Sequence, residues 1–291
     1  MGSCGSCFSS LRYYLVSVFA SDKSAGKAGL AVDLQLNNKK VLITGGSRGI
    51  GRAVGGTLAG EGCQVVLASR TEADLQKAQA EITEATGSEV SVYAFDLSQT
   101  ENLERLMAAC TDVDILVNNA GAIPGGSLFS VDEPRWREAW DLKVFGYINL
   151  TRMMYKVMKE RGSGVIVNII GLAGERFDAN YIAGSTGNAG LMAFTRALGG
   201  TSLDDGIRVV GVNPGLIATD RMKTLLQTRA ENELGDKGRW QELLKGLPLD
   251  RAGEPQEIAD LVAFLASPKA SYISGVIYSV DGGVAARTKV V

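Results

Sequence analysis

From Lys40 onward, short runs rich in Val, Ile and Leu alternate with longer segments whose apolar residues recur at helical spacing. In one such segment, 72–86, the residues Leu75, Ala78 and Ile82 fall on one face. The apolar runs predict strands over residues 41–44, 65–69, 90–95, 113–118, 164–170, 207–213 and 276–280. The segments between them predict helices over residues 49–60, 72–86, 99–110, 132–161, 185–203, 219–245 and 255–266.

Strands that are apolar throughout and separated by helices indicate a parallel sheet covered on both faces. The pattern therefore predicts a doubly wound α/β fold with about seven parallel strands, in a single domain over residues 34–291. Ligands of such sheets bind at the carboxyl ends of the strands. The longest segment expected at that edge, 216–249, is predicted to be a substrate lid, whose apolar residues either line the pocket or pack the lid onto the body: Met222, Leu225, Leu226, Trp240 and Leu247.

The first 33 residues differ from the rest because they are rich in Ser, Gly and Ala around one apolar run, 13–20. That run is too short to span a bilayer, which needs about twenty apolar residues. We expect a disordered leader or an extension foreign to the native protein. The opening residues also fit the loose N-myristoylation pattern of eukaryotes, with Cys4 and Cys7 as palmitoylation candidates.

Composition narrows the chemistry of this chain of 291 residues. Thirty basic and 32 acidic residues leave a net charge of −2, which gives no basic footprint for nucleic acid. The absence of histidine excludes Ser-His-Asp and Cys-His catalytic pairs and histidine metal sites, and no metal is expected. The four cysteines imply no disulfide framework, so a reducing compartment, the cytoplasm, is expected.

A glycine-rich loop follows the first predicted strand. The segment 44–51 reads Thr-Gly-Gly-Ser-Arg-Gly-Ile-Gly and opens the next helix. Glycines at this place allow a tight turn and let a pyrophosphate approach the free N–H groups of the helix. The loop predicts a dinucleotide site that includes Gly45, Ser47, Gly49, Ile50 and Gly51.

The end of the second strand indicates which dinucleotide binds. An NAD site would place Asp or Glu there to accept a hydrogen bond from the ribose 2′-hydroxyl. This chain has Ser69 and Arg70 instead, with Arg48 in the glycine loop as a second cation. Arginine pairs well with a 2′-phosphate, so the sequence favours NADP(H) over NAD(H). The alternative is that both arginines are merely solvated.

At this point the chain resembles the short-chain dehydrogenase/reductase family over residues 36–283. The resemblance rests on the glycine loop and on further motifs at 95–97, 118–121, 213–219, 251–255 and 274–283. It implies a Rossmann fold, oxidoreductase activity on a small carbonyl or alcohol substrate, and a homodimer or homotetramer. It also implies that the cofactor contacts Asp96, Leu97, Asn118, Ala120, Gly121, Asn188, Pro214, Gly215, Ile217 and Thr219.

The resemblance fails at the catalytic positions. Family members use an Asn-Ser-Tyr-Lys set, in which the tyrosine exchanges a proton with the substrate oxygen. Aligned on the helix start at 189–191, this chain places Gly184 at the tyrosine position and Asn188 at the lysine position. Gly171 falls at the serine position and Lys143 at the asparagine position. All four positions are therefore substituted.

Three interpretations follow from this substitution. The first is a reductase or dehydrogenase with another proton donor, because positioning is worth effective molarities of about 10⁵–10⁸ M and general acid catalysis about 10²–10⁴-fold. Its candidate donors are Lys143, unless it forms an ion pair with Asp141 or Asp178, and Tyr181, unless its ring only packs. The second is a catalytically inactive NADP(H)-binding protein. The third is non-redox chemistry, such as a lyase or dehalogenase reaction.

Overall fold

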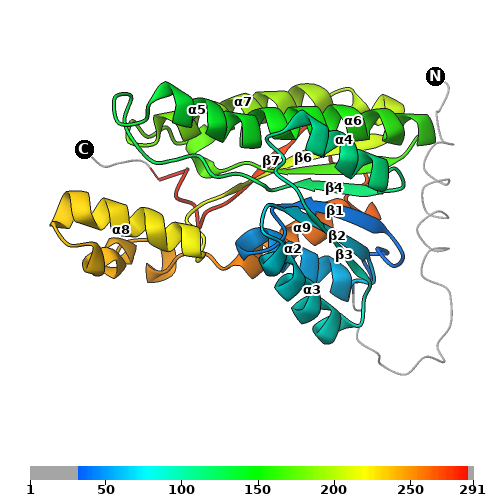
Figure 1. The fold of residues 1–291 in the computed structure, drawn as a ribbon, viewed down its shortest axis with the longest axis horizontal. Helices are drawn as coiled ribbons and strands as arrows, with labels where there is room; N and C mark the ends of the chain where they lie inside the picture. Colours follow the sequence, from blue (N-terminus) through cyan, green and yellow to red (C-terminus); the bar gives the residue numbers. More distant parts are fainter. Residues whose placement is uncertain (1–31, 288–291) are drawn as a thin grey trace, which may run out of the picture. The chain divides into compact units, whose positions relative to one another are not determined.

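The computed structural model describes residues 32–287. Its seven strands are all parallel and form one sheet in the order β3-β2-β1-β4-β5-β6-β7 (Figure 1). The predicted doubly wound Rossmann fold is confirmed. Apart from residues 32 and 33, the predicted leader lies outside the described residues, and its acylation pattern lies there entirely. The strands are β1 (Lys40–Thr44), β2 (Gln64–Ser69), β3 (Val90–Ala94), β4 (Ile115–Asn118), β5 (Gly164–Ile169), β6 (Ile207–Pro214) and β7 (Ile277–Val280).

Helices cover both faces of the sheet. One face packs against α2 (Gly49–Gly60), α3 (Glu72–Thr86) and α9 (Pro255–Ala266). The other packs against α4 (Thr100–Ala109) and α6 (Gly146–Arg161), with α5 (Glu133–Trp140) and α7 (Ile182–Gly199) in the same layer (Figure 1). The helix α8 (Asp220–Leu234) belongs to the predicted lid. No helix within residues 32–287 has the length and apolar content that a membrane span requires.

Three of the predicted helices differ from their predicted bounds by several residues or are interrupted. The predicted helix 132–161 contains a π-helical turn, Asp141–Phe145, which separates α5 from α6. The predicted helix 185–203 begins earlier, at Ile182, because Ser185 does not cap it: the Ser185 hydroxyl instead accepts a hydrogen bond from the Asp178 amide at 3.1 Å. That helix also ends earlier, at Gly199, and a 3₁₀ turn follows it. The predicted excursion 219–245 is α8 followed by a second 3₁₀ segment, Lys237–Leu244.

A buried polar ladder crosses the middle of the sheet. The Asn118 amide donates to Thr151 at 3.0 Å and to the Asn168 oxygen at 2.9 Å. The Asn168 amide in turn donates to Thr195 at 2.9 Å. The ladder joins β4 and β5 to α6 and α7, and buried polar groups of this kind are costly unless paired. It therefore fixes the side chain of Asn118 at the end of β4.

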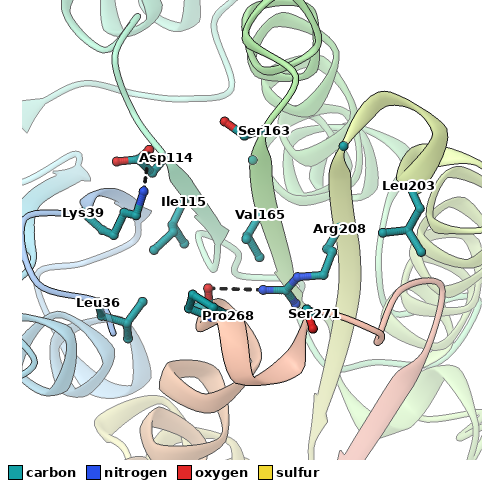
Figure 2. A pocket seen from close by; sticks show the side chains of 13 residues that line it. Leu36, Lys39, Asp114, Ile115, Ser163, Val165, Leu203, Arg208, Pro268 and Ser271 are labelled. Atoms are coloured by element: carbon teal, nitrogen blue, oxygen red, sulfur yellow. Dashed lines mark hydrogen bonds and ion pairs between the residues drawn. The ribbon is translucent and has the colours of Figure 1, made fainter. Parts of the chain in front are cut away.

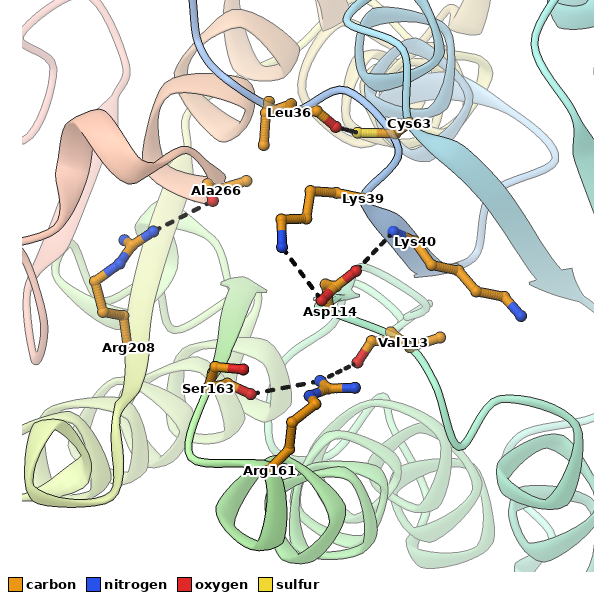
Figure 3. Close-up of polar contacts among 10 residues, drawn as sticks. All are labelled: Leu36, Lys39, Lys40, Cys63, Val113, Asp114, Arg161, Ser163, Arg208 and Ala266. Atoms are coloured by element: carbon orange, nitrogen blue, oxygen red, sulfur yellow. Dashed lines mark hydrogen bonds and ion pairs between the residues drawn. The ribbon is translucent and has the colours of Figure 1, made fainter.

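A cavity of about 290 Å³ lies at the amino-terminal edge of the sheet, opposite the edge where the predicted ligand site lies. Figure 2 shows that the side chain of Arg208, from β6, forms part of the wall of this cavity. Lys39 and Asp114 also line the cavity and form an ion pair at 3.5 Å. Arg208 is only 7% exposed and donates to the carbonyl groups of Leu265, Ala266 and Ser267, where α9 ends. Figure 3 shows the contact with Ala266. The carbonyl groups in the last turn of a helix have no partner within it, so by binding those of Leu265 and Ala266 Arg208 joins the end of α9 to the sheet.

Replacing Arg208 with methionine is expected to lower the free energy of unfolding by about 3 kcal/mol, because buried carbonyl groups would lose a charged donor. Urea or thermal denaturation measures the change. The exposed Arg135 on α5, replaced in the same way, is the control and should change stability by less than about 0.5 kcal/mol. Equal stability of the two variants would contradict a structural role for Arg208.

Candidate functional site

The glycine loop lies between β1 and α2 and forms a cradle of backbone. Gly45 has a φ of +66°, which favours glycine, and the helix begins at Gly49. A Cβ atom on Gly51 would collide with the carbonyl oxygen of Gly45. No acidic side chain lies in the first turn of α2, and Arg48 provides no side-chain cap. The free N–H groups of this turn are therefore available to an anion.

Hydrogen bonds hold this loop against the end of β4. The Thr44 hydroxyl accepts from the amides of Asn119 and Ala120, at 2.9 and 3.0 Å. The Asn119 side chain donates to the carbonyl groups of Thr44 and Gly45, at 3.0 and 3.1 Å. The predicted motif 118–121 thus lies beside the glycine loop, and the sequence analysis assigned no role to its Asn119.

The loop after β6 completes the same edge. Thr219 caps α8, since its hydroxyl accepts from the Met222 amide at 3.2 Å. A Cβ atom on Gly49 would lie 3.1 Å from the Thr219 methyl group, so the two loops are in contact. At the end of β6, Gly215 donates to the carbonyl group of Val280 at 2.9 Å. Pro214, Ile217 and Thr219 therefore share one edge with the glycine loop.

The region after β2 and β3 has one free cation and one paired cation. Arg70 is exposed and has no hydrogen bond or ion pair with the part of the chain that the structure describes. Arg48 instead forms an ion pair with Asp74 of α3, at 2.7 Å. Asp96 accepts from the amide and hydroxyl of Ser98, at 3.0 and 2.8 Å, and Leu97 is buried.

Three buried side-chain oxygens at this edge, those of Ser69, Asn118 and Asn188, have no hydrogen-bond partner among residues 32–287. They lie at the ends of β2 and β4 and in the second turn of α7. Leaving such atoms without a partner costs about 1–3 kcal/mol each. The arrangement therefore fits a polar ligand that extends along the carboxyl ends of the strands, as a dinucleotide does.

Lys143 lies in the π-helical turn, a distortion that frequently marks functional sites. Its ammonium group donates to the carbonyl group of Ile170, just beyond β5, and its stem packs against Gly121. Neither Asp141 nor Asp178 forms an ion pair with it, so the ion-pair alternative is wrong. Loss of hydration, together with the charge of Arg221, lowers the pKa of Lys143 to about 7.

Two of the other aligned catalytic positions, 171 and 188, lie close to Lys143. A Cβ atom on Gly171 would lie 2.9 Å from the amide nitrogen of Asn188. The Gly171 amide donates to the side chain of Asn213 at 3.3 Å. Positions 143, 171 and 188 are therefore neighbours at the end of β5.

Tyr181 lies over Gly184. A Cβ atom on Gly184 would collide with the ring carbons of Tyr181, so this ring fills the space that a side chain at position 184 would need. The ring also packs with Ile123, Ala139 and Ala183. The packing alternative for Tyr181 is therefore present in the structure, although its hydroxyl forms no hydrogen bond with residues 32–287.

The predicted lid segment contains a residue at the site that was not expected from the sequence alone. Arg221, in the first turn of α8, donates to the carbonyl group of Ile123 at 2.6 Å, across the site. Its position at the start of a predicted helix could have marked it as a candidate site residue. A cation in the first turn opposes the helix dipole and is therefore unfavourable for the helix itself. The predicted lid residues divide between two environments. Met222, Leu226 and Trp240 pack among themselves, whereas Leu225 approaches Gly125 on the opposite loop.

Replacing Gly51 with alanine is expected to abolish dinucleotide binding, because the added methyl group would push the glycine loop out of position. Titration calorimetry with NADPH measures the loss. Gly56, further along α2, is the matched control because a Cβ atom there would meet nothing within 4 Å. The Gly56→Ala variant should bind normally and be more stable by about 0.5–1 kcal/mol. Normal binding by the Gly51→Ala variant would contradict the assignment of the cradle.

Comparison with known proteins identifies the family. Residues 45–285 match the family model described as enoyl-(acyl carrier protein) reductase. The chain is 35% identical over 257 residues to the 3-oxoacyl-[acyl-carrier-protein] reductase FabG of Chlamydia muridarum, covering 86% of this chain and 98% of FabG.

Two solved structures agree with this match. The L-sorbose reductase of Gluconobacter frateurii, complexed with NADPH and L-sorbose, has a TM-score of 0.81 at 29% identity and covers 88% of this chain and 100% of its own. A 7α-hydroxysteroid dehydrogenase complexed with NADH has a TM-score of 0.78 at 31% identity and covers 86% of this chain and 96% of its own. The chain therefore belongs to the short-chain dehydrogenase/reductase family and is an oxidoreductase by descent.

Proposed function

We propose that the protein is an NADP(H)-dependent oxidoreductase that interconverts a carbonyl compound and an alcohol, with Lys143 as the proton donor. The observation that carries this proposal is the position of Lys143. Its ammonium group lies at the end of β5, among the loops that form the dinucleotide cradle, and the pKa of this group is lowered to about 7. A general acid works best when its pKa is near the working pH.

The choice of NADP(H) rests on this chain's own residues, because one solved relative carries NADPH and another carries NADH. No carboxylate stands at the end of β2, where Ser69 has a buried oxygen without a partner. Arg70 is free to pair with a 2′-phosphate. Asp74, the nearby acid, is neutralised by Arg48, so it does not repel that phosphate.

The other assigned residues would hold the cofactor along the carboxyl edge. The free N–H groups of the glycine loop would bind the pyrophosphate, and Asp96 and Leu97 would flank the adenine. Asn118, Ala120 and Gly121 would follow the ribose and nicotinamide, with Asn188 and the loop 214–219 completing the site. When bound, the cofactor supplies or accepts a hydride at its nicotinamide ring.

In the direction of reduction, Lys143 donates one proton to the substrate oxygen while the carbonyl carbon receives the hydride. The products are the alcohol, the oxidised cofactor and a neutral amine, which regains a proton from water. The Ile170 carbonyl group orients the ammonium group for this transfer. Tyr181 is the weaker candidate because its ring lies directly over Gly184, where the hydroxyl stays close to the helix.

Arg70 should confer the preference for NADPH. We expect NADPH to bind about tenfold or more tightly than NADH, a difference of about 1.4 kcal/mol. The Arg70→Ser variant should lose this preference by weakening NADPH alone, as measured by nucleotide fluorescence. Lys77→Gln, which removes an exposed cation from α3, is the control and should leave both affinities unchanged. Equal affinity of the original chain for both nucleotides would contradict the proposal.

Carbonyl reduction should depend on pH through Lys143. The ammonium form is present below its pKa, so the rate should be constant below about pH 7 and fall about tenfold per pH unit above it. Lys143→Met should lower kcat by about 10²–10⁴-fold and abolish this dependence. Initial rates of NADPH oxidation with a panel of neutral ketones and aldehydes, measured from pH 5.5 to 9, supply both results.

Tyr181→Phe is the matched variant for this experiment and should retain kcat within about threefold, since its ring still fills the space over Gly184. A loss as large as that of Lys143→Met would assign the proton donor to Tyr181. Nucleotide binding without turnover of any carbonyl compound would favour the catalytically inactive alternative. Turnover without nucleotide would favour lyase or dehalogenase chemistry. The homodimer or homotetramer and the cytoplasmic location stay predictions.

A further inference from the structure

Two cations face the proposed site, and no carboxylate accompanies them. Lys143 donates to the Ile170 carbonyl group from one side, and Arg221 donates to the Ile123 carbonyl group from the lid. Neither forms an ion pair with residues 32–287. Both contact the same loop, because the Lys143 stem packs against Gly121 and Arg221 binds the carbonyl group of Ile123, two residues further on.

The acidic groups on the neighbouring elements are engaged elsewhere or exposed. In the loop after β5, Glu175 accepts from Ser279 at 2.8 Å and Asp178 accepts from the Asn180 amide at 2.8 Å. In the same loop, Arg176 donates to the Val284 carbonyl group at 3.1 Å. Asp220, on α8, and Asp141, in the π-helical turn, are exposed and form no ion pair with either cation. Within residues 32–287, no ion pair therefore balances the two positive charges at this place.

The placement of Arg221 is also unfavourable for the helix that carries it. A cation in the first turn of α8 opposes the helix dipole. Its only side-chain hydrogen bond within residues 32–287 is to a main-chain carbonyl group on the opposite loop, so no described side chain fixes its charge. Met222 and Leu226 already pack α8 into the lid without it. This arrangement is explained if the partner of Arg221 is a ligand.

We infer that the substrate is an oxo acid, whose carboxylate binds Arg221 while its carbonyl oxygen faces Lys143. This inference rests on the proposed function and names its substrate class. Because the two cations contact one loop at positions two residues apart, we expect the two oxygen groups of the substrate to be close, as they are in 2-oxo and 3-oxo acids. Arginine binds a carboxylate through two parallel hydrogen bonds, which also fixes the orientation of the carbonyl group.

Binding of the acid would also favour the protonated form of Lys143, which is the form that donates the proton. A carboxylate beside Arg221 cancels the charge that opposes protonation of Lys143, so the ammonium form is favoured once substrate is bound. A neutral ketone gives no such compensation. The pH at which reduction declines should therefore be higher with oxo acids than with neutral ketones.

Titration calorimetry tests the inference without turnover, on the full chain with and without NADP⁺. The probes are phenylglyoxylate and acetoacetate, each compared with its methyl ester. We expect each acid to bind about tenfold or more tightly than its ester. Arg221→Gln should remove this difference, and the control Lys223→Gln, an exposed cation on the same helix, should preserve it.

Three results would overturn the inference: equal binding of acid and ester, an acid preference that survives in Arg221→Gln, or binding of neither probe. Failure of the proposed function has a different outcome. In that case the acids would bind through Arg221, but neither they nor neutral ketones would be reduced by NADPH. Reduction of neutral ketones without any preference for acids would leave the proposed function standing and refute the inference about Arg221.

Discussion

The hydroxyl group of Thr44 is the contact on which the arrangement of the site depends. Thr44 is the last residue of β1, and its hydroxyl group accepts hydrogen bonds from two amides in the loop after β4. This contact joins the two central strands at their carboxyl ends. Asn119 reinforces the contact by donating back to the carbonyl groups of the glycine loop. The cradle is therefore formed by main chain that is already held in place, which lowers the entropic cost of binding a long polar ligand.

The pKa of Lys143, at the end of β5, depends on a different constraint. Its ammonium group is held by a carbonyl group instead of a carboxylate. A carboxylate partner would raise the pKa of Lys143 and keep it charged, whereas a neutral carbonyl group only orients it. Gly121 leaves room for the lysine stem, and the π-helical turn directs it toward β5. A lysine in this environment can act both as donor and as acceptor of a proton near neutral pH.

The regular part of the fold could be predicted from the sequence because it depends on local periodicity. The bounds of α3 and α9 agree with the apolar spacing, and the glycine loop stands where its motif places it. The π-helical turn left no such signal, because its residues continue a helical pattern. Arg221 and Asn119 were missed for another reason: their roles depend on contacts between loops distant in the sequence. The ring of Tyr181 fills the space next to Gly184, and this contact likewise could not be predicted from the sequence because it depends on how the side chain is oriented in the fold.

The π-helical turn within the long helical segment has a consequence for how this region can vary. An α-helix advances about 100° per residue, so one added residue rotates everything beyond it by that angle. As a result α5 presents Trp136 and Trp140 to a small cluster around Ile123, whereas α6 presents Met154 to the sheet. The continuous helical segment formed by α5, the π-helical turn and α6 therefore packs into two separate hydrophobic clusters. Substitutions on the α5 side can change the packing around Ile123, whose carbonyl group binds Arg221, while the register of α6 against the sheet is preserved.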